Sequence, residues 1–544
     1  MSKLSSWKTI FFLCAFCAAT ESTAPAQIGC SVAAPCFTIL ASFNGADGSF
    51  PVFAPVVQGF DGNFYGTAGN GGSHSDGTIF KITSGGTLTP LHSFNGTDGL
   101  APAAGLVLTA KGNFYGTTAN GGAHSDGTIF KFVLNPQGTG GTLTTLHSFD
   151  GADGSRPNGL IQAIDGNIYG TTQGGGASTN CSGGCGTVFK FVLNPQGTGG
   201  TLTTLHSFDS TDGAAPFSSL LQASDGNFYG TTYAGGAHND GVVFKMTPPP
   251  TGTVTVLHNF DGTDGANSYG SLIQAVNGIL YGMTAFGGAN ECNNHGSLVG
   301  CGTIFKITLA GAFTTLHNFD SSDGAFPSVP LIQATDGNLY GTTYQKGGTN
   351  GFGTVFKFTP GGTLTTIHTF GTPVDPNALL QVTNGEFYGT TIFGGTNNDG
   401  TVFSLSVGLG PFVETLPTSG KVGTAVIILG NNLKGSTKVT FNGTAATFTV
   451  VSNTEIKTSV PSGAITGKVK VTTPSRTLTS NVNFRVTPTI SSTSPTSGPP
   501  GISVVINGES FTGATSVTFG GVKGTITSVS YTKITATVLS GSKR

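Results

Sequence analysis

The sequence predicts an all-β protein in which a seven-bladed β-propeller is followed by two smaller β-rich domains. A motif of about 50 residues recurs seven times before residue 407, and each copy contains four strand-like segments separated by glycine-rich turns. This period and this number of strands are typical of a propeller blade. The composition agrees, because 87 of the 544 residues are glycine and only 9% are charged, which leaves few residues that favour helices.

The first 26 residues have the pattern of a secretory signal peptide. Lys3 and Lys8 precede an apolar run over Ile10–Ala19, and Ala24-Pro25-Ala26 forms a cleavage site of the A-x-A type. The apolar run is too short to span a bilayer, and no second hydrophobic stretch follows it. We therefore expect residues 1–26 to be removed. The mature protein should have no transmembrane segment and should be secreted, either extracellular or at the cell surface.

The cysteines remaining after cleavage are expected to form disulfides. Cleavage leaves six of them, in three close pairs: Cys30 and Cys36, Cys181 and Cys185, and Cys292 and Cys301. An even number in an exported chain predicts disulfides. Metal binding is the alternative, but these pairs lack the histidine partners and the spacing of a zinc site. We expect neighbours to pair, although sequence alone leaves the connectivity open.

The seven copies occupy residues 27–407, the predicted propeller. In the third copy the four strands are "NGLIQAI", "GNIYGTT", "GTVFKFVL" and "TLTTLHSF". A blade cannot bury both of its faces alone, so neighbouring blades must pack around a ring. Two aromatic positions recur and are expected to fill the space between blades: tyrosines at Tyr65, Tyr115, Tyr169, Tyr229, Tyr281, Tyr340 and Tyr388, and phenylalanines at Phe80, Phe130, Phe189, Phe244, Phe305, Phe356 and Phe403.

Closure of the ring is predicted from a strand count. The seventh copy has three strands, and an isolated segment, "FTILASF" at residues 37–43, matches the missing fourth strand. Pairing of this N-terminal segment with the last blade would leave no open sheet edge. The twenty residues Lys131–Asp150, repeated without change at Lys190–Asp209, then form the outer hairpin of two successive blades.

Residues 408–487 and 488–544 align with each other. Both contain Pro-Thr-Ser-Gly, an alternating apolar strand, Gly-x-x-[Leu/Phe], and Val-Thr-Phe followed by a glycine. This pattern resembles the IPT/TIG family of immunoglobulin-like β-sandwiches. The second copy stops where the first continues into its last two strands, so we expect it to be truncated and incomplete, with an exposed edge. The family also occurs in transcription factors, but the signal peptide and a net charge of −2 argue against nucleic acid. In exported bacterial proteins the resemblance implies spacers or adhesion modules.

The repeats themselves resemble a bacterial tandem-repeat family called GloVer, a choice-of-anchor family. Asn-[Phe/Leu]-Tyr-Gly-Thr-Thr, Gly-Gly and Gly-Thr-Val-Phe-Lys recur over about residues 37–406. The resemblance implies the architecture and an exported surface location, and it implies no activity.

Polar loops point to one face of the propeller, because the loops after the second and the fourth strands emerge at the same end of each blade. Those after the fourth strand repeat an aspartate at Asp98, Asp153, Asp212, Asp264 and Asp323, and those after the second strand carry His74 with Asp76, His124 with Asp126, and His238 with Asp240. We predict a polar ligand face, for sugar or for Ca²⁺, an ion that prefers oxygen ligands.

An alternative reading is that Asp-Gly and Asn-Gly are simply favourable turn sequences, and recurrence in every blade favours it. The histidines of the "LHSF" segments are expected on the outermost strand as edge residues rather than ligands. Two cysteine-bearing loops break the symmetry on the same face, and stapled loops on a rigid scaffold are candidates for recognition.

Enzyme motifs are missing from the sequence. There is no sialidase-type Ser-x-Asp-x-Gly-x-Thr-Trp, no Gly-x-Ser-x-Gly, no His-Glu-x-x-His, and no tryptophan after Trp7. We therefore expect no catalytic residues, no metal site and no cofactor other than Ca²⁺. The prediction is a non-enzymatic, monomeric binding or adhesion protein for an extracellular polysaccharide or a surface protein. The alternative is a propeller-fold glycoside hydrolase or lyase with a carboxylate pair across the central channel.

Overall fold

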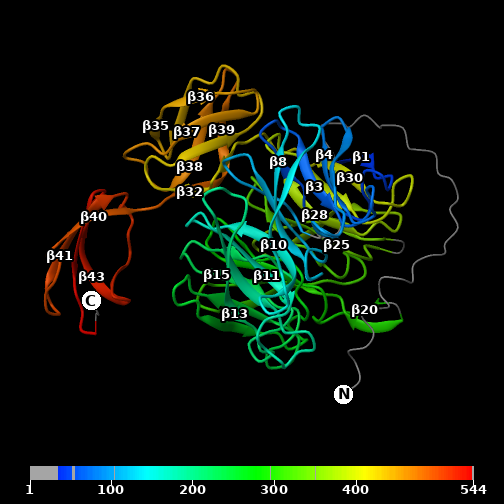
Figure 1. Ribbon diagram of the computed structural model, residues 1–544, viewed down its shortest axis with the longest axis horizontal. Helices are drawn as coiled ribbons and strands as arrows, with labels where there is room; N and C mark the ends of the chain where they lie inside the picture. The colour runs from blue at the N-terminus through cyan, green and yellow to red at the C-terminus, as the bar shows by residue number, and fades with distance from the viewer. Residues whose placement is uncertain (1–34, 52–54, 103, 295, 349–350, 542–544) are drawn as a thin grey trace.

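The computed structural model describes residues 35–51, 55–102, 104–294, 296–348 and 351–541, and the predicted signal peptide lies outside them. All regular elements in these ranges are β-strands, so the all-β prediction is confirmed. A ring of sheets carries two further β-rich units at its C-terminal end (Figure 1). None of the described residues forms a helix long and apolar enough to cross a membrane.

Seven four-stranded antiparallel sheets form the ring, each in the order first to fourth strand. The first four blades are β2–β5 (Val57–Gln58, Phe64–Ala68, Thr78–Ile82, Leu88–Ser93), β6–β9 (Val107–Leu108, Phe114–Thr118, Thr128–Leu134, Gly141–Ser148), β10–β13 (Ser155–Gln162, Ile168–Gly174, Thr187–Leu193, Gly200–Ser207) and β14–β17 (Leu221–Gln222, Phe228–Thr231, Val242–Met246, Val254–Asn259).

The fifth blade contains an inserted hairpin between its second and third strands. Its sheet is β18, β19, β22 and β23 (Ile273–Gln274, Leu280–Thr284, Thr303–Ile307, Phe313–Asn318), and the hairpin is β20 and β21 (Glu291–Asn294, Ser297–Gly300). The sixth blade is β24–β27 (Ile332–Gln333, Leu339–Thr343, Thr354–Phe358, Leu364–Thr369), and the seventh contains β28, β29 and β30 (Pro376–Gln381, Phe387–Thr391, Thr401–Ser406).

The repeated aromatic residues pack between neighbouring blades, as predicted. Tyr65 of the first blade contacts Phe114 of the second at a ring-centroid distance of 4.7 Å, and both side chains are buried. The glycine after each tyrosine leaves room for the phenylalanine of the third strand. A Cβ on Gly66 would lie 2.6 Å from the ring of Phe80, closer than side chains tolerate. The Tyr-Gly-Thr motif is therefore a packing requirement.

The ring is closed by the N-terminal strand. β1 (Cys36–Ser42) pairs antiparallel with β30 and completes the seventh sheet in the order β1-β30-β29-β28. Phe43 follows it and packs against Phe80 of the first blade at 5.1 Å. At the innermost strands, the Thr383 N–H donates to Gln58 Oε1 at 3.1 Å, which joins the seventh blade to the first. The closing strand expected from the count is present.

The first C-terminal unit is a two-sheet sandwich. One sheet has the order β31-β33-β37-β36 (Glu414–Leu416, Ala425–Leu429, Glu455–Ser459, Phe448–Val450) and the other β32-β39-β38-β34-β35 (Ser419–Gly420, Thr477–Val486, Gly467–Thr472, Lys438–Phe441, Thr444–Ala446). Val426, Ile428, Val439, Val469 and Phe484 are among the residues that fill the core between the sheets. This is the arrangement expected of an immunoglobulin-like domain.

The second unit contains a single sheet in the described residues. Its order is β40-β41-β44-β43-β42 (Thr489–Ser494, Ser503–Glu509, Lys533–Thr537, Val522–Val529, Val517–Phe519). The described residues of this unit contain no counterparts of β38 and β39. Its buried core is correspondingly small, with Val504, Ile506, Phe511, Ile534 and Ala536.

The first sandwich contacts one face of the propeller. In an antiparallel blade, the turns after the first and third strands lie at one end, which we call the turn face, and the loops after the second and fourth strands lie at the other, the loop face. Thr454 Oγ1 donates to the Phe60 carbonyl at 2.7 Å, and Asn431 Nδ2 donates to Thr383 Oγ1 at 2.7 Å. Both acceptors follow a first strand. The sandwich is therefore docked on the turn face.

Candidate ligand-binding face

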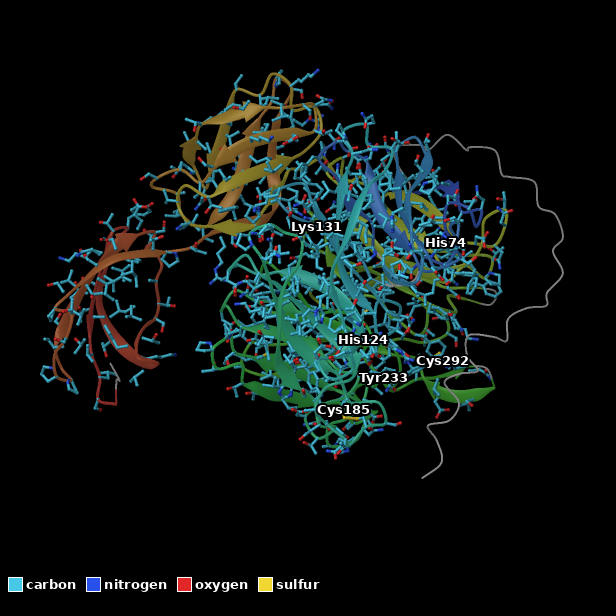
Figure 2. The ribbon with its side chains drawn as sticks, viewed as in Figure 1. His74, His124, Lys131, Cys185, Tyr233 and Cys292 are labelled. Atoms are coloured by element: carbon cyan, nitrogen blue, oxygen red, sulfur yellow. A yellow bond between two sulfur atoms is a disulfide. The ribbon has the colours of Figure 1, made fainter. Side chains whose placement is uncertain are left out.

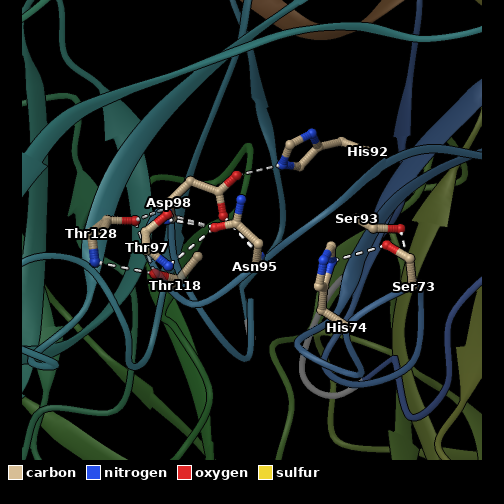
Figure 3. A network of polar contacts seen from close by, with 9 residues as sticks. All are labelled: Ser73, His74, His92, Ser93, Asn95, Thr97, Asp98, Thr118 and Thr128. Carbon is tan, nitrogen blue, oxygen red and sulfur yellow. Dashed lines mark hydrogen bonds and ion pairs between the residues drawn. The ribbon is translucent and has the colours of Figure 1, made fainter.

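The five repeated aspartates of the loop face are each bound to a histidine of the same blade. Asp98 Oδ2 lies 2.9 Å from His92 Nε2 (Figure 3), and in the other four blades the same contact measures 2.7 Å, in the pairs His147–Asp153, His206–Asp212, His258–Asp264 and His317–Asp323. All ten side chains are about one-fifth exposed. The histidines do lie on the fourth strand as expected, but they anchor the following loop, a role that the edge-residue interpretation missed.

A polar residue three positions before each repeated aspartate completes a hydrogen-bonded turn. Asp150 Oδ1 accepts the N–H groups of Ala152 and Asp153, at 3.0 and 3.2 Å, while Asp153 Oδ1 accepts the N–H of Asp150. The backbone N–H of Asp153 holds the pKa of Asp150 below its usual value. For Asp98, burial acts to raise the pKa, but hydrogen bonds from His92 and the Asn95 N–H outweigh it, and the pKa is lowered. These carboxylates are ionised and satisfied within their own turns.

The His–Asp loops after the second strands combine exposed and half-buried groups. His74, His124 and His238 are exposed, whereas Asp76, Asp126 and Asp240 are half-buried. The backbone carbonyl of Asp240 accepts the Asn267 N–H at 2.8 Å, so this segment also supports the start of the next blade. Burial raises the pKa of Asp240, with attraction from His238 and repulsion from Asp261 and Asp264 as smaller influences.

The described polar residues of the loop face are not arranged as metal ligands. Within the described ranges, no three His, Cys, Asp or Glu side chains are arranged to hold an ion. The repeated carboxylates instead accept hydrogen bonds from their own loops. The side chains present on this face therefore do not fit a Ca²⁺ site.

Two of the three expected disulfides are present on this face. Cys181 is bonded to Cys185 and Cys292 to Cys301, each with a Cα–Cα distance of 5.1 Å. The second bond closes the inserted hairpin of β20 and β21, which projects from the ring in Figure 1. Cys36 is also disulfide-bonded, and Cys30 lies outside the described residues.

A cluster of aromatic side chains also occupies the loop face and was missed by the sequence reasoning. Phe217, Tyr233 and Tyr269 contact one another, with ring centroids 5.3, 5.1 and 4.9 Å apart. All three are half-buried, as is Tyr344 of the sixth blade. Burial and the neighbouring Tyr233 raise the pKa of Tyr269, so its hydroxyl stays protonated. In the view of Figure 2, Tyr233 lies among His124, Cys185 and Cys292.

A sequence signal for this cluster does exist. Tyr233 and Tyr344 follow the Gly-Thr-Thr of the second strand, a position that the other blades fill with Gly69, Ala119, Gln173, Ala285 and Ile392. This position varies from blade to blade, so a prediction based on recurring residues does not include it.

Two surface grooves lie on the opposite, turn face. One of about 310 Å³ lies between the first two blades and includes Phe60, Asp61 and Pro136 in its lining, and another of about 270 Å³ includes Asp165, Tyr169 and Lys190. The last three residues form a repeated contact, in which Asp165 accepts from Tyr169 at 2.8 Å and from Lys190 at 3.1 Å. Asp225, Tyr229 and Lys245 repeat it in the next blade. We attribute these grooves to blade packing.

Comparison with known proteins identifies both parts of the chain. The profile of the Gloeobacter/Verrucomicrobia repeat matches residues 29–181, 132–298, 178–403 and 292–450. The IPT/TIG profile matches residues 488–543, the last unit. The preceding unit is a two-sheet sandwich whose sequence aligns with that of the last unit. The chain matches no curated protein.

Several solved structures are similar at low identity. Virginiamycin B lyase from Staphylococcus aureus is 13% identical over 69% of this chain and 99% of that one, with a TM-score of 0.46. A fungal alcohol oxidase is 14% identical over 81% and 98%, with a TM-score of 0.45. A gluconolactonase from Xanthomonas campestris is 14% identical over 68% and 88%, with a TM-score of 0.33. We draw no function from these similarities. The repeat matches, by contrast, extend over residues 29–450, well over half of the sequence, and the protein is therefore a member of the Gloeobacter/Verrucomicrobia repeat family.

Proposed function

We propose that this protein is an exported, non-enzymatic binding protein of the cell surface or the extracellular space. In this proposal the loop face of the propeller contacts the ligand, and the two C-terminal domains act as spacers. The observation that carries it is the docking of the first sandwich on the turn face, through Thr454 and Asn431. In the described part of the chain, this leaves the loop face uncovered. The disulfides support an oxidising compartment.

The internal bonding of the loops supports binding rather than catalysis. The repeated aspartates are held by histidines and backbone N–H groups, as in the pair of His206 and Asp212 at 2.7 Å. A surface that is ordered before the ligand arrives loses little conformational entropy on binding. The preorganised loop face therefore suits a recognition role.

A carbohydrate-active enzyme is the second candidate, and one residue favours it. Asp240 is half-buried with a raised pKa, next to the carboxylates Asp261 and Asp264. A carboxyl group of this kind is what a general acid for glycoside cleavage requires.

One experiment separates the two candidates. The full chain is incubated with a panel of immobilised polysaccharides, with Ca²⁺ and with a chelator, while retained protein and released reducing sugar are both measured. We expect retention without sugar release, and no effect of the chelator. Sugar release that disappears in Asp240→Asn would establish the enzyme instead, and absence of retention on every polysaccharide would overturn the proposal.

A further inference from the structure

Several departures from sevenfold symmetry lie together at one place on the loop face. Each blade has a residue in the left-handed backbone region at or shortly before its first strand, with φ between 50 and 60°: Phe50, Ala101, Arg156, Ala215, Asn267, Phe326 and Asp375. The backbone at this position is therefore nearly identical in all seven blades. The side chains are not, since they range from Ala to Arg.

The backbone hydrogen bonds show that the second-strand position is equally repetitive. The N–H of Gly69 donates to the Phe50 carbonyl at 2.9 Å, and that of Tyr233 donates to Ala215 at 3.1 Å. In the sixth blade, the N–H of Tyr344 makes the same bond to Phe326 at 3.3 Å. Because the bond forms with glycine as well as with tyrosine, the fold does not require an aromatic side chain here. The tyrosines need another explanation.

These exceptions are contiguous across neighbouring blades. Phe217 and Tyr233 of the fourth blade contact Tyr269 of the fifth, and Tyr344 of the sixth is near enough to contribute to the raised pKa of Tyr269. Phe217 and Tyr269 each lie two residues after the left-handed position, near the loop-face end of the innermost strand, which lines the central channel of a propeller. We call Phe217, Tyr233, Tyr269 and Tyr344 the channel-mouth cluster.

Amide groups border the cluster on the side of the third blade. Gln173 Nε2 donates to Asn158 Oδ1 at 2.9 Å, and Asn158 Nδ2 donates to the carbonyl of Pro216, the residue before Phe217. On the other side, Asn267 Nδ2 donates to the Tyr233 carbonyl at 2.8 Å. The amides thus fix the backbone that carries the rings. Asn158 is buried, so the half-buried Gln173 and Asn267 are the amides that lie beside the rings.

We infer that the channel-mouth cluster is a binding site for a neutral glycan. A sugar ring has an apolar C–H face that packs on an aromatic ring and a rim of hydroxyls that pairs with amides and phenols. Half-buried tyrosines bordered by Gln and Asn offer both kinds of contact. Their partial burial also fixes their orientation, which reduces the entropy lost when a ligand binds. The inference rests on the proposed binding function and names the ligand class and the part of the loop face.

Affinity electrophoresis of the full chain tests the inference, with soluble neutral β-glucan, xylan, mannan and starch as probes. Tyr233→Ala and Tyr269→Ala are expected to weaken retardation by the bound polysaccharide at least tenfold, as for truncation of a central aromatic contact. Tyr233→Phe keeps the ring and should retain binding within about threefold, because only the hydroxyl is lost.

Phe393→Ala is the matched control. Phe393 is half-buried on the same face and makes an edge-on contact with Phe50 at 5.3 Å, on the opposite side of the ring. It should bind as the unaltered chain does. If the unaltered chain binds a probe and the Tyr→Ala variants bind equally well, or Phe393→Ala loses as much, the inference is overturned while the proposed function stands. If none of these probes binds but a charged polysaccharide is retained, the glycan is not neutral and the inference again fails alone.

Discussion

The closing strand offers a test with a matched internal control. Phe43 follows β1 and contacts Phe80 at 5.1 Å, and its N–H donates to Gly400 at 3.0 Å. Phe208 occupies the same position in the third blade, where it contacts Phe244 at 5.2 Å and donates to Gly186 at 3.0 Å. Both side chains are fully buried. The two phenylalanines therefore have the same packing and differ in how their strands are joined to the chain.

Truncation to alanine should cost about 3–5 kcal/mol at either position, the usual range for a buried phenylalanine. The consequences should differ, however. β13 is joined to β12 by a short turn, whereas β1 pairs with a strand some 360 residues away, as in Ser42 with Thr401. In Phe43→Ala we expect β1 to detach as a unit. A loss of about 4 kcal/mol corresponds to about a thousandfold less protection of the β30 amides.

Native-state hydrogen exchange followed by mass spectrometry resolves the two cases. In Phe43→Ala the fast exchange should be confined to β1 and β30. In Phe208→Ala, exchange should rise over the third and fourth blades together, because the tethered strand opens only with its neighbours. Equal protection of β30 in both variants would show that β1 is not an independent closing element, and the account of ring closure would be wrong.

Two further predictions concern titrating groups. A double-mutant cycle with His92→Ala and Asp98→Asn should give a coupling of about 1–2 kcal/mol in urea unfolding, the value for a hydrogen bond to a charged group reduced for partial exposure. Because the folded pKa of Asp98 is lowered from 3.8, this stability is present above the unfolded pKa and is lost as the pH falls through the folded pKa. Coupling of the same size in acid, where Asp98 is protonated, would contradict the pairing. Glu414 of the first sandwich is the opposite case, since burial raises its pKa from 4.5 to about 7. Its charged form destabilises the folded state as the pH rises through this interval. Glu414→Gln should therefore be more stable than the unaltered protein by about 2 kcal/mol at pH 8, which is the upper bound of about 3 kcal/mol reduced for the remaining exposure of the side chain, and equally stable at pH 4. Equal stability of the two proteins in thermal unfolding at pH 8 would refute this prediction.

Repetition explains why the fold was predictable. A weak strand pattern becomes a firm prediction when seven copies agree, and the strand count alone located β1 at residues 37–43, close to the observed Cys36–Ser42. The Tyr and Phe positions were assigned to blade packing for the same reason. Each of these features depends on contacts within one blade or with the next, so each leaves a periodic trace in the sequence.

The candidate site was predicted less completely. Some of its contacts do not recur from blade to blade, and others join residues on the two sides of a turn. The sequence interpretation treated His92 as an edge residue and Asp98 as a ligand group, although the two side chains meet across the five residues between them. The channel-mouth cluster draws Phe217, Tyr269 and Tyr344 from three blades, through residues up to about 130 positions apart. Their proximity follows from the closed ring and from no local pattern.

The duplicated twenty residues show how far identical sequence determines contacts. Lys131 and Lys190 begin the two copies, yet Lys131 Nζ donates to the Gly197 carbonyl of the following blade, whereas Lys190 pairs with Asp165 of its own blade. The cause lies outside the duplication. The blade after Lys131 has the turn Asn194-Pro-Gln-Gly197, whereas the blade after Lys190 has Thr247-Pro-Pro-Pro at this place. Lys81 of the first blade likewise donates to Gly138, in the matching turn of the second blade, although its own blade has Asp61. The backbone of a blade is thus set by the repeat, but the partners of its side chains also depend on the turn of the neighbouring blade.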